Sequence, residues 1–139
     1  MPRGRFLVFE GIDGAGKSTQ IELLAQALRE RGLDPVLSRE PTDGPWGRRL
    51  RESATTGRMS AADELAHFIH DRTEHVKQLI EPSLAAGRWV ILDRYYYSTI
   101  AYQGVRGLDP QGLLQQMERL FPKPDRVFLL DLDPAAGLR

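Results

Sequence analysis

The chain has 139 residues, of which 41% are hydrophobic, and its 19 basic and 19 acidic residues give a formal net charge of zero. This length and composition predict a single domain with a packed core. The balanced charge argues against a basic surface for nucleic acid, and no apolar run is long enough to span a membrane. Because there is no cysteine, disulfides and thiolate-based metal sites are excluded. We therefore expect a cytoplasmic enzyme that binds neither nucleic acid nor a membrane.

Residues 11–19, with the sequence GIDGAGKST, match the pattern G-x-x-x-x-G-K-[ST] of a phosphate-binding loop. An apolar run at 5–10 predicts a strand before the loop, and apolar residues at helical spacing predict a helix after it. Glycines let backbone N–H groups surround phosphate oxygens, and the start of the helix adds partial positive charge. Lys17 reaches the outer phosphates and the Ser18 hydroxyl binds Mg²⁺. The expected triphosphate contacts are Gly11, Asp13, Gly14, Ala15, Gly16, Lys17, Ser18 and Thr19.

The elements after the loop alternate in type through the first half of the chain. The first helix is expected to be closed by Gly32, because glycine is the usual residue just past a helix end. A second strand is expected at 35–40. A turn at 42–47 and a short helix at 48–53 follow it.

A long helix is expected at the start of the second half of the chain. Ser60 and Asp63 resemble a capping box at the start of this helix. Pro82 is expected to bend the helix, and Gly87 is expected to end it. The later elements are expected to be a strand at 89–92, a helix at 95–103, a loop at 104–107, a helix at 109–120 and a strand at 126–132.

Strands and helices thus alternate, which predicts an α/β fold with a parallel sheet of about four strands and helices on both faces. Asp133 and Pro134 form a further N-cap and first-turn pair. The sequence ends at Arg139, about one turn into the helix that this pair would open. We therefore expect the sequence to be incomplete relative to its fold.

Charged residues of both signs follow the predicted strands, namely Glu10, Arg39 with Glu40, Asp93 with Arg94, and Asp131 with Asp133. The carboxyl ends of parallel strands share one edge of a sheet, and ligands bind there. The planar fork of arginine suits phosphate, and a carboxylate suits Mg²⁺ directly or through its waters. The sequence therefore predicts a phosphate and magnesium site at this edge.

Arg72 lies on the apolar stripe of the predicted long helix, four residues after Phe68. It either forms a structural ion pair or places its guanidinium beside an aromatic ring at the edge of a substrate pocket. The basic residues of the 48–53 helix, by contrast, are expected to form a solvated face: Arg48, Arg49 and Arg51. Packed or solvated side chains, rather than metal ligands, are also expected for His67, His70 and His75.

In this order and spacing, the motifs resemble the amino-terminal two thirds of the thymidylate kinases, a family of P-loop nucleoside monophosphate kinases. The resemblance covers essentially all 139 residues. It implies the P-loop NTPase fold and Mg²⁺-dependent transfer of the γ-phosphoryl group of ATP to dTMP, giving dTDP. It rests on the loop at 11–19, Arg39-Glu40-Pro41, Phe68 with Arg72, Asp93-Arg94-Tyr95, Ser98-Thr99, Ala101-Tyr102-Gln103-Gly104 and Pro124-Asp125.

The resemblance also implies roles for individual residues. The catalytic cations would be Lys17, Arg39 and Arg94, with both arginines on the acceptor phosphate. The Mg²⁺ ion would lie at Ser18 and near Asp93. The dTMP contacts would further include Asp13 at the sugar 3′-hydroxyl, Phe68 stacked on thymine, Arg72 at the base edge, and Thr99, Tyr102 and Gln103 along the base and sugar. The partner of Arg72 would then be a nucleobase and not another side chain.

Two features depart from the family pattern. Family members continue well beyond this length, with a lid over ATP, part of the adenine pocket, a fifth strand and closing helices. Gly14 stands where some members have an arginine, and members with glycine there take their catalytic basic residues from the lid. We therefore expect this chain to hold the phosphate loop and the dTMP pocket without the lid or the last strand.

Alternatives stay open at this stage. Another P-loop nucleotide or deoxynucleoside kinase is one, and a nucleoside kinase would need a carboxylate base, for which Glu40 is the only candidate. A non-catalytic nucleotide-binding module is another. The family usually forms homodimers through helices, so the apolar stripe at 65–80 serves either a second copy or the core.

Overall fold

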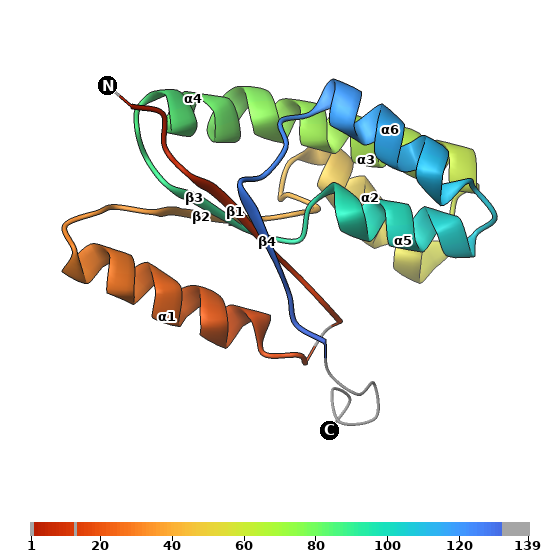
Figure 1. Cartoon of the computed structure of the whole chain (residues 1–139). Helices are drawn as coiled ribbons and strands as arrows, with labels where there is room; N and C mark the ends of the chain where they lie inside the picture. The colour runs from red at the N-terminus through yellow and green to blue at the C-terminus, as the bar shows by residue number, and fades with distance from the viewer. Residues whose placement is uncertain (1, 13, 132–139) are drawn as a thin grey trace.

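Four parallel strands form the centre of the molecule in a computed structural model that describes residues 2–12 and 14–131 (Figure 1). Their order across the sheet is β2-β3-β1-β4, and every neighbouring pair is parallel. This confirms the parallel sheet of four strands predicted from the alternating pattern. The strands are β1 (Phe6–Glu10), β2 (Val36–Arg39), β3 (Val90–Asp93) and β4 (Arg126–Leu129).

Helices cover both faces of the sheet, as predicted. In Figure 1, α1 (Lys17–Glu30) lies below the strands, the long helix that contains α3 and α4 lies above them with α6, and α5 lies to the right, beyond the strand ends. Side chains alternate along β1: Phe6 and Val8 belong to the core under the upper helices, and Leu7 and Phe9 pack on the α1 side. The core opposite α1 is shared by α3 (Ala61–His75), η1 (Val76–Ile80), α4 (Glu81–Ala85), α5 (Tyr96–Val105) and α6 (Pro110–Leu120).

Helix ends follow the predicted signals. Gly32 adopts a left-handed φ of 82°, and the N–H groups of Gly32 and Leu33 donate to the carbonyls of Arg29 and Leu28. The Ser60 hydroxyl accepts from the N–H of Asp63 at 3.1 Å at the start of α3. At the start of α6, the Asp109 carboxylate accepts from two backbone N–H groups of the first turn. These caps fix where the elements of the site begin.

Two helices extend beyond their predicted bounds. The helix predicted at 48–53 is longer, because α2 (Pro45–Thr56) begins with proline at its first turn. Gly47 lies inside this helix, where a Cβ would come within 2.0 Å of the Thr42 carbonyl oxygen. The predicted loop at 104–107 starts later, since α5 runs to Val105; a Cβ on Gly104 would lie 3.2 Å from the ring of Pro110. Close packing, rather than a turn, explains both glycines.

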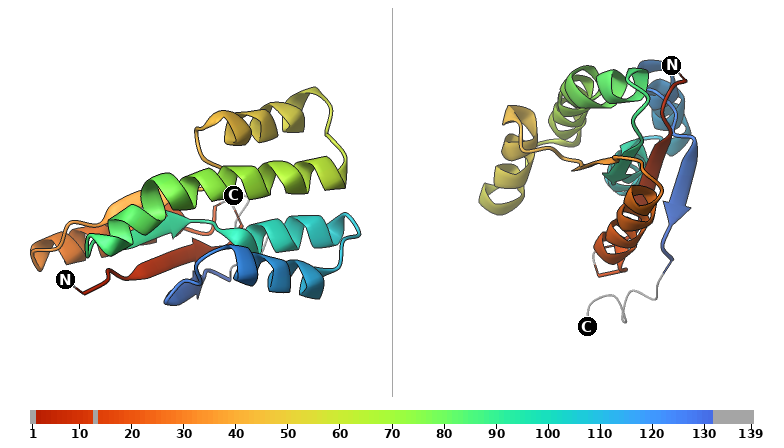
Figure 2. Two further views of the ribbon diagram at one scale, coloured as in Figure 1. Left: turned by 90° about the horizontal axis from the view of Figure 1, so that it is seen from above. Right: turned by 90° about the vertical axis from the view of Figure 1, so that its left-hand side faces the viewer.

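The long helix contains a π-helical turn in the segment before Pro82. There the N–H of Glu81 donates to the carbonyl of Val76, five residues earlier. Proline lacks the N–H that a regular turn would use, so the distortion lies where the sequence predicted a bend. Figure 2 shows α2 running alongside α3, the first part of this long helix. In the described part of the chain, no helix is long and apolar enough to cross a membrane.

Candidate active site

The phosphate loop connects β1 to α1, as the motif requires. Gly14 and Gly16 have φ angles of 84° and 94°, values that only glycine adopts easily. Lys17 begins α1 with only 6% of its surface exposed, and its Nζ donates to the Gly11 carbonyl at 2.6 Å. Asp13 lies outside the described residues. The loop therefore presents turned backbone and a positioned ammonium group at the carboxyl edge of the sheet.

A cavity of about 550 Å³ opens beside the ends of β2 and β3. Its walls come from both strand ends and from α2, α3 and α5. The predicted site residues that line it are Arg39, Phe68, Arg72, Asp93, Arg94, Thr99 and Tyr102. Gln103 does not line it: the side chain is fully buried, and its Nε2 donates to Glu64, which is part of the cavity wall. The structure thus brings residues that are up to 63 positions apart (39 to 102) into one concave site.

Arg72 has side-chain partners, so the expectation that it would lack them was wrong. Its Nε donates to Glu40 at 2.7 Å and its Nη2 donates to Thr99 at 2.8 Å. The guanidinium also lies 5.3 Å from the ring centre of Tyr95 and 5.4 Å from that of Phe121. Because Arg72 is buried on an apolar stripe, its positive charge needs an anionic partner, and Glu40 supplies it. Arg72 nevertheless lines the cavity, so it belongs to both alternatives that the sequence left open.

Glu64 organises a second charged cluster on the cavity wall. It accepts both nitrogens of the Arg58 fork at 3.0 and 3.1 Å, and Arg106 lies 3.3 Å away. Burial would raise the pKa of this carboxyl, but the hydrogen bonds from Arg58 and Gln103 outweigh it and lower the pKa. Glu64 stays ionised and ties the start of α3 to α5. The sequence analysis missed this cluster because its members are scattered along the chain.

Arg94 stands at the turn between β3 and α5 with a positive φ of 73°, which is uncommon for a residue with a side chain. Its N–H donates to Phe9 at 2.8 Å, and its Nη1 donates to the Tyr102 hydroxyl at 3.0 Å. Arg39, from the end of β2, is 63% exposed in its side chain and lies 3.4 Å from Asp43. Two arginines therefore flank the cavity from neighbouring strands.

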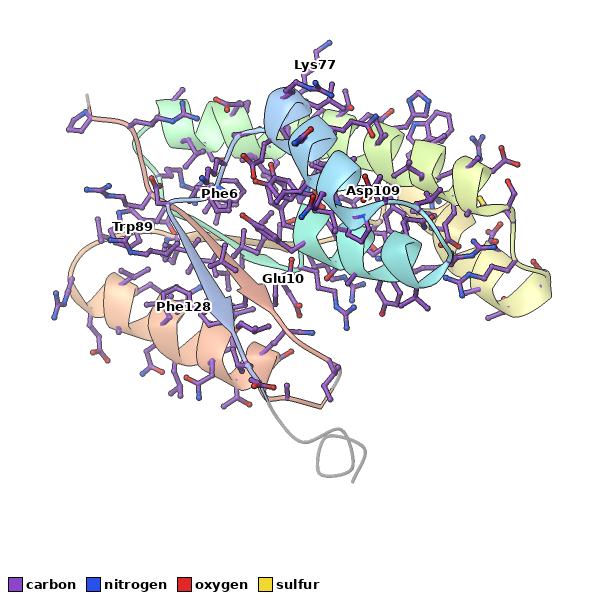
Figure 3. The ribbon with its side chains drawn as sticks, turned by 45° about the vertical axis from the view of Figure 1, so that its right-hand side comes forward. Phe6, Glu10, Lys77, Trp89, Asp109 and Phe128 are labelled. Carbon is purple, nitrogen blue, oxygen red and sulfur yellow. The ribbon has the colours of Figure 1, made fainter. Side chains whose placement is uncertain are left out.

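Glu10 holds the start of α5 in place (Figure 3). Its carboxylate accepts from the N–H of Tyr95 at 3.1 Å and from the Ser98 hydroxyl at 2.5 Å. Burial raises the pKa of Glu10, against the opposing effect of these hydrogen bonds and of the nearby Arg94 charge. The sequence placed Glu10 among the strand-end charges of a predicted phosphate and magnesium site, whereas its carboxylate binds the start of α5. Its role is to cap the helix that carries Thr99 and Tyr102.

Ser18 and Asp93 are the two residues that the resemblance assigns to Mg²⁺. Both residues line a second cavity of about 460 Å³ next to the phosphate loop. Asp93 Oδ1 is buried and accepts no hydrogen bond from the described residues, although Lys17 Nζ lies 3.6 Å away. A carboxylate oxygen without a hydrogen bond and a hydroxyl on the same cavity wall are oxygen ligands of the kind that Mg²⁺ takes, together with water and phosphate. No group of three or more His, Cys, Asp or Glu that could hold a metal exists within residues 2–12 and 14–131.

The other predicted groups divide between core and cavity. Arg51 is not purely solvated, since it lines the cavity and donates to the carbonyls of Pro41 and Thr42. The imidazole of His75 is buried, and His70 stacks on Trp46 at 4.4 Å. The apolar stripe at 65–80 packs inward, because these side chains join the core cluster: Leu65, Ile69, Val76 and Ile80. Core packing therefore accounts for the stripe.

Comparisons with known proteins agree with the resemblance. The family model described as thymidylate kinase matches residues 9–139. A thymidylate kinase from Akkermansia muciniphila is 54% identical over 136 residues, which are 98% of this chain and 66% of the relative. One from Xanthomonas campestris pv. campestris is 53% identical over 137 residues, 99% of this chain and 60% of the relative. The chain thus spans 60% and 66% of the length of these two relatives.

A solved structure gives the same result. The crystal structure of thymidylate kinase from Ehrlichia chaffeensis superimposes with a TM-score of 0.82 at 37% sequence identity. The match covers 99% of this chain and 77% of that one. At this similarity the P-loop NTPase fold expected from the sequence is confirmed.

Proposed function

The chain belongs to the thymidylate kinase family, and on that basis we propose that it supplies the phosphate loop and the acceptor pocket for transfer of the γ-phosphoryl group of ATP to dTMP. The observation that carries the proposal is the 550 Å³ cavity next to the phosphate loop. Six residues that the resemblance assigns to dTMP line it: Arg39, Phe68, Arg72, Arg94, Thr99 and Tyr102.

On the donor side, the backbone of the loop and Lys17 would bind the ATP phosphates. Lys17 is buried and held by Gly11 and Asp93, so little of its side-chain entropy remains to be lost on binding. Ser18 and Asp93 would hold Mg²⁺, which neutralises negative charge on the phosphates when bound. The loop contributes positive charge that is in place before the reaction starts.

On the acceptor side, Phe68 would stack on the thymine base and Arg72 would donate to its edge. Arg39 and Arg94 would hold the acceptor phosphate, with forks that donate hydrogen bonds in pairs. Tyr102 would pack near the 2′ carbon and disfavour a ribose. No general base is needed, because the attacking phosphate oxygen is already anionic, so positioning and charge neutralisation carry the catalysis.

The alternative of a deoxynucleoside kinase is disfavoured by Glu40. Such an enzyme needs a carboxylate free to take a proton from a hydroxyl. The Glu40 side chain is 3% exposed, and both oxygens are engaged, one by Arg72 and one by His75. A carboxylate held in this way serves structure rather than proton transfer.

A coupled kinase assay with ATP, Mg²⁺ and a panel of dTMP, dUMP, AMP, CMP and thymidine tests the proposal, together with calorimetric binding of the same panel. We expect dTMP to be the preferred acceptor and the tightest ligand. Preference for AMP, CMP or thymidine would overturn the proposal. Tight dTMP binding without turnover would instead favour a non-catalytic nucleotide-binding module. The homodimer implied by the resemblance is part of the proposal, and light scattering after gel filtration tests it.

A further inference from the structure

A buried hydrogen-bond chain runs behind the wall of the acceptor cavity. Arg72 Nε donates to Glu40 Oε1 at 2.7 Å, Glu40 Oε2 lies 2.8 Å from His75 Nδ1, and His75 Nε2 lies 2.8 Å from the Ser38 hydroxyl. The side chains of Arg72, Glu40 and His75 are 2%, 3% and 4% exposed. The chain links the end of β2 to the end of α3. Neither His75 nor Ser38 lines the cavity, and neither is part of a sequence motif.

Chemistry fixes the direction of the two hydrogen bonds to Glu40. An ionised carboxylate only accepts, and arginine only donates. His75 must therefore donate from Nδ1 to Glu40. The other ring nitrogen, Nε2, lies 2.8 Å from the Ser38 hydroxyl, so both nitrogens of His75 have a partner.

The hydrogen bond from His75 to Glu40 affects which of its two neighbours, Glu40 or Thr99, the Nη2 group of Arg72 binds. The Nε–H and one Nη2–H of a guanidinium point to the same side and can bind both oxygens of one carboxylate. Here Glu40 takes only the Nε–H, and Nη2 donates to Thr99 at 2.8 Å instead. His75 occupies the second oxygen of Glu40. Without that donor, Oε2 would be buried and unpaired, and it would turn toward Nη2 in place of Thr99.

We infer that His75 is a positioning residue for base recognition: by holding Glu40, it fixes the angle at which Arg72 faces the acceptor cavity. The inference rests on the proposed function, in which Arg72 donates to the thymine of dTMP. It predicts that His75 affects recognition of the base and leaves recognition of the phosphates unchanged, although His75 itself touches neither.

The test compares binding of dTMP, 2-deoxyribose 5-phosphate and ATP to the full 139-residue chain by calorimetry. His75→Phe keeps a ring but removes both nitrogens, and His75→Asn keeps an amide donor near the position of Nδ1. We expect His75→Phe to weaken dTMP binding roughly tenfold, about the contribution of one hydrogen bond to a nucleobase. Binding of deoxyribose 5-phosphate and ATP should stay within about twofold, and His75→Asn should recover most of the dTMP affinity.

Two further variants keep the outcome decisive. His70→Phe is the matched control, because His70 is exposed on the same helix and stacks on Trp46, away from the cavity. His75→Gln places its amide near Nε2, toward Ser38, so it should bind dTMP as weakly as His75→Phe. If His75→Phe does not fold, the Asn and Gln variants alone decide.

Equal affinity of the Asn and Gln variants for dTMP, or a parallel loss of dTMP and deoxyribose 5-phosphate, would overturn the positioning role. A parent chain that binds dTMP no better than deoxyribose 5-phosphate would overturn the proposed function as well. A parent chain that prefers dTMP while His75→Phe is unchanged would overturn the His75 inference alone.

Discussion

The phosphate loop and the acceptor pocket lie side by side but are built in opposite ways. The loop is one contiguous segment, and its exposed glycines offer main-chain groups. The pocket is assembled from the ends of two strands and three helices, and it depends on charged side chains that are almost completely buried, such as Glu40 and Arg72. The loop should therefore lose ligand affinity but not stability when its cation is removed, whereas the pocket should lose both.

The largest expected effect is on stability, from Arg72→Met. Removing the arginine leaves Glu40 as a buried charge with His75 as its remaining partner, which costs about 3–5 kcal/mol of unfolding free energy. Urea denaturation measures this cost. The double variant Glu40→Gln/Arg72→Met should recover part of it, because no buried charge is left unpaired. Arg39→Met is the control. Because the Arg39 side chain is mostly exposed, the unfolding free energy of this variant should differ from that of the parent chain by less than about 0.5 kcal/mol. Equal losses in both single variants would contradict the argument.

The same contrast explains what the sequence could and could not predict. The loop was found from its pattern, because its ligands are neighbours in the chain and their backbone conformation follows from the glycines. The parallel sheet followed from alternating elements, and the helix caps followed from local residues such as Ser60 and Asp109. The sequence signal for each of these features lies within a few neighbouring positions, even though the strands themselves pair over long distances in the chain.

The pocket could not be predicted in the same way. Glu40 and Arg72 are 32 residues apart, and nothing local in the sequence pairs them. Gln103 follows the family spacing, yet its side chain turns toward Glu64 rather than into the cavity. For His75, the sequence predicted only a packed or solvated side chain, without a partner. Long-range partners of buried charges are set by how the elements pack, which only the structure reveals.

The next largest effect is on ATP affinity, from Lys17→Met. A hydrogen bond to a charged group contributes about 1.5–3 kcal/mol, so ATP should bind roughly 10- to 100-fold more weakly. Binding of dTMP should be unchanged, because Lys17 does not line the acceptor cavity. Calorimetric titrations with both nucleotides check this. Lys77→Met is a matched control, since Lys77 projects into solvent from η1 (Figure 3). A comparable loss of dTMP affinity would show that the two regions are coupled.

A smaller effect, on dTMP affinity, is expected from Tyr102→Phe. The change removes the hydroxyl that accepts from Arg94 at 3.0 Å but keeps the ring beside the cavity. One such bond contributes about 0.5–1.5 kcal/mol, so dTMP affinity should fall roughly two- to tenfold. The preference for deoxyribose over ribose should persist, because the ring and not the hydroxyl would exclude the 2′ oxygen. Competition between dTMP and its ribose analogue measures both effects. Tyr97→Phe, outside this cavity, serves as the control.

The smallest effect is on the pH dependence of stability, through two buried carboxylates, Glu10 and Glu64, whose pKa values shift in opposite directions. Burial raises the pKa of Glu10 above its ordinary value of 4.5, so the folded chain binds more protons than the unfolded chain just above that pH. Stability from this group is present below pH 4.5 and is lost as the pH rises through the folded pKa. Glu64 is the opposite case, because its pKa is lowered and its stabilisation is lost as the pH falls through the folded pKa.

Two glutamine variants test this difference in pH dependence. Glu10→Gln cannot titrate, so its unfolding free energy relative to the parent chain should rise as the pH is raised from 4.5. Glu64→Gln should be less stable than the parent at neutral pH, and the difference should shrink below pH 4.5. Urea denaturation between about pH 3 and 7 follows both. A pH-independent difference for Glu10→Gln would mean that the folded Glu10 titrates normally. Burial at the start of α5 would then be offset by the N–H of Tyr95, the Ser98 hydroxyl and the helix dipole.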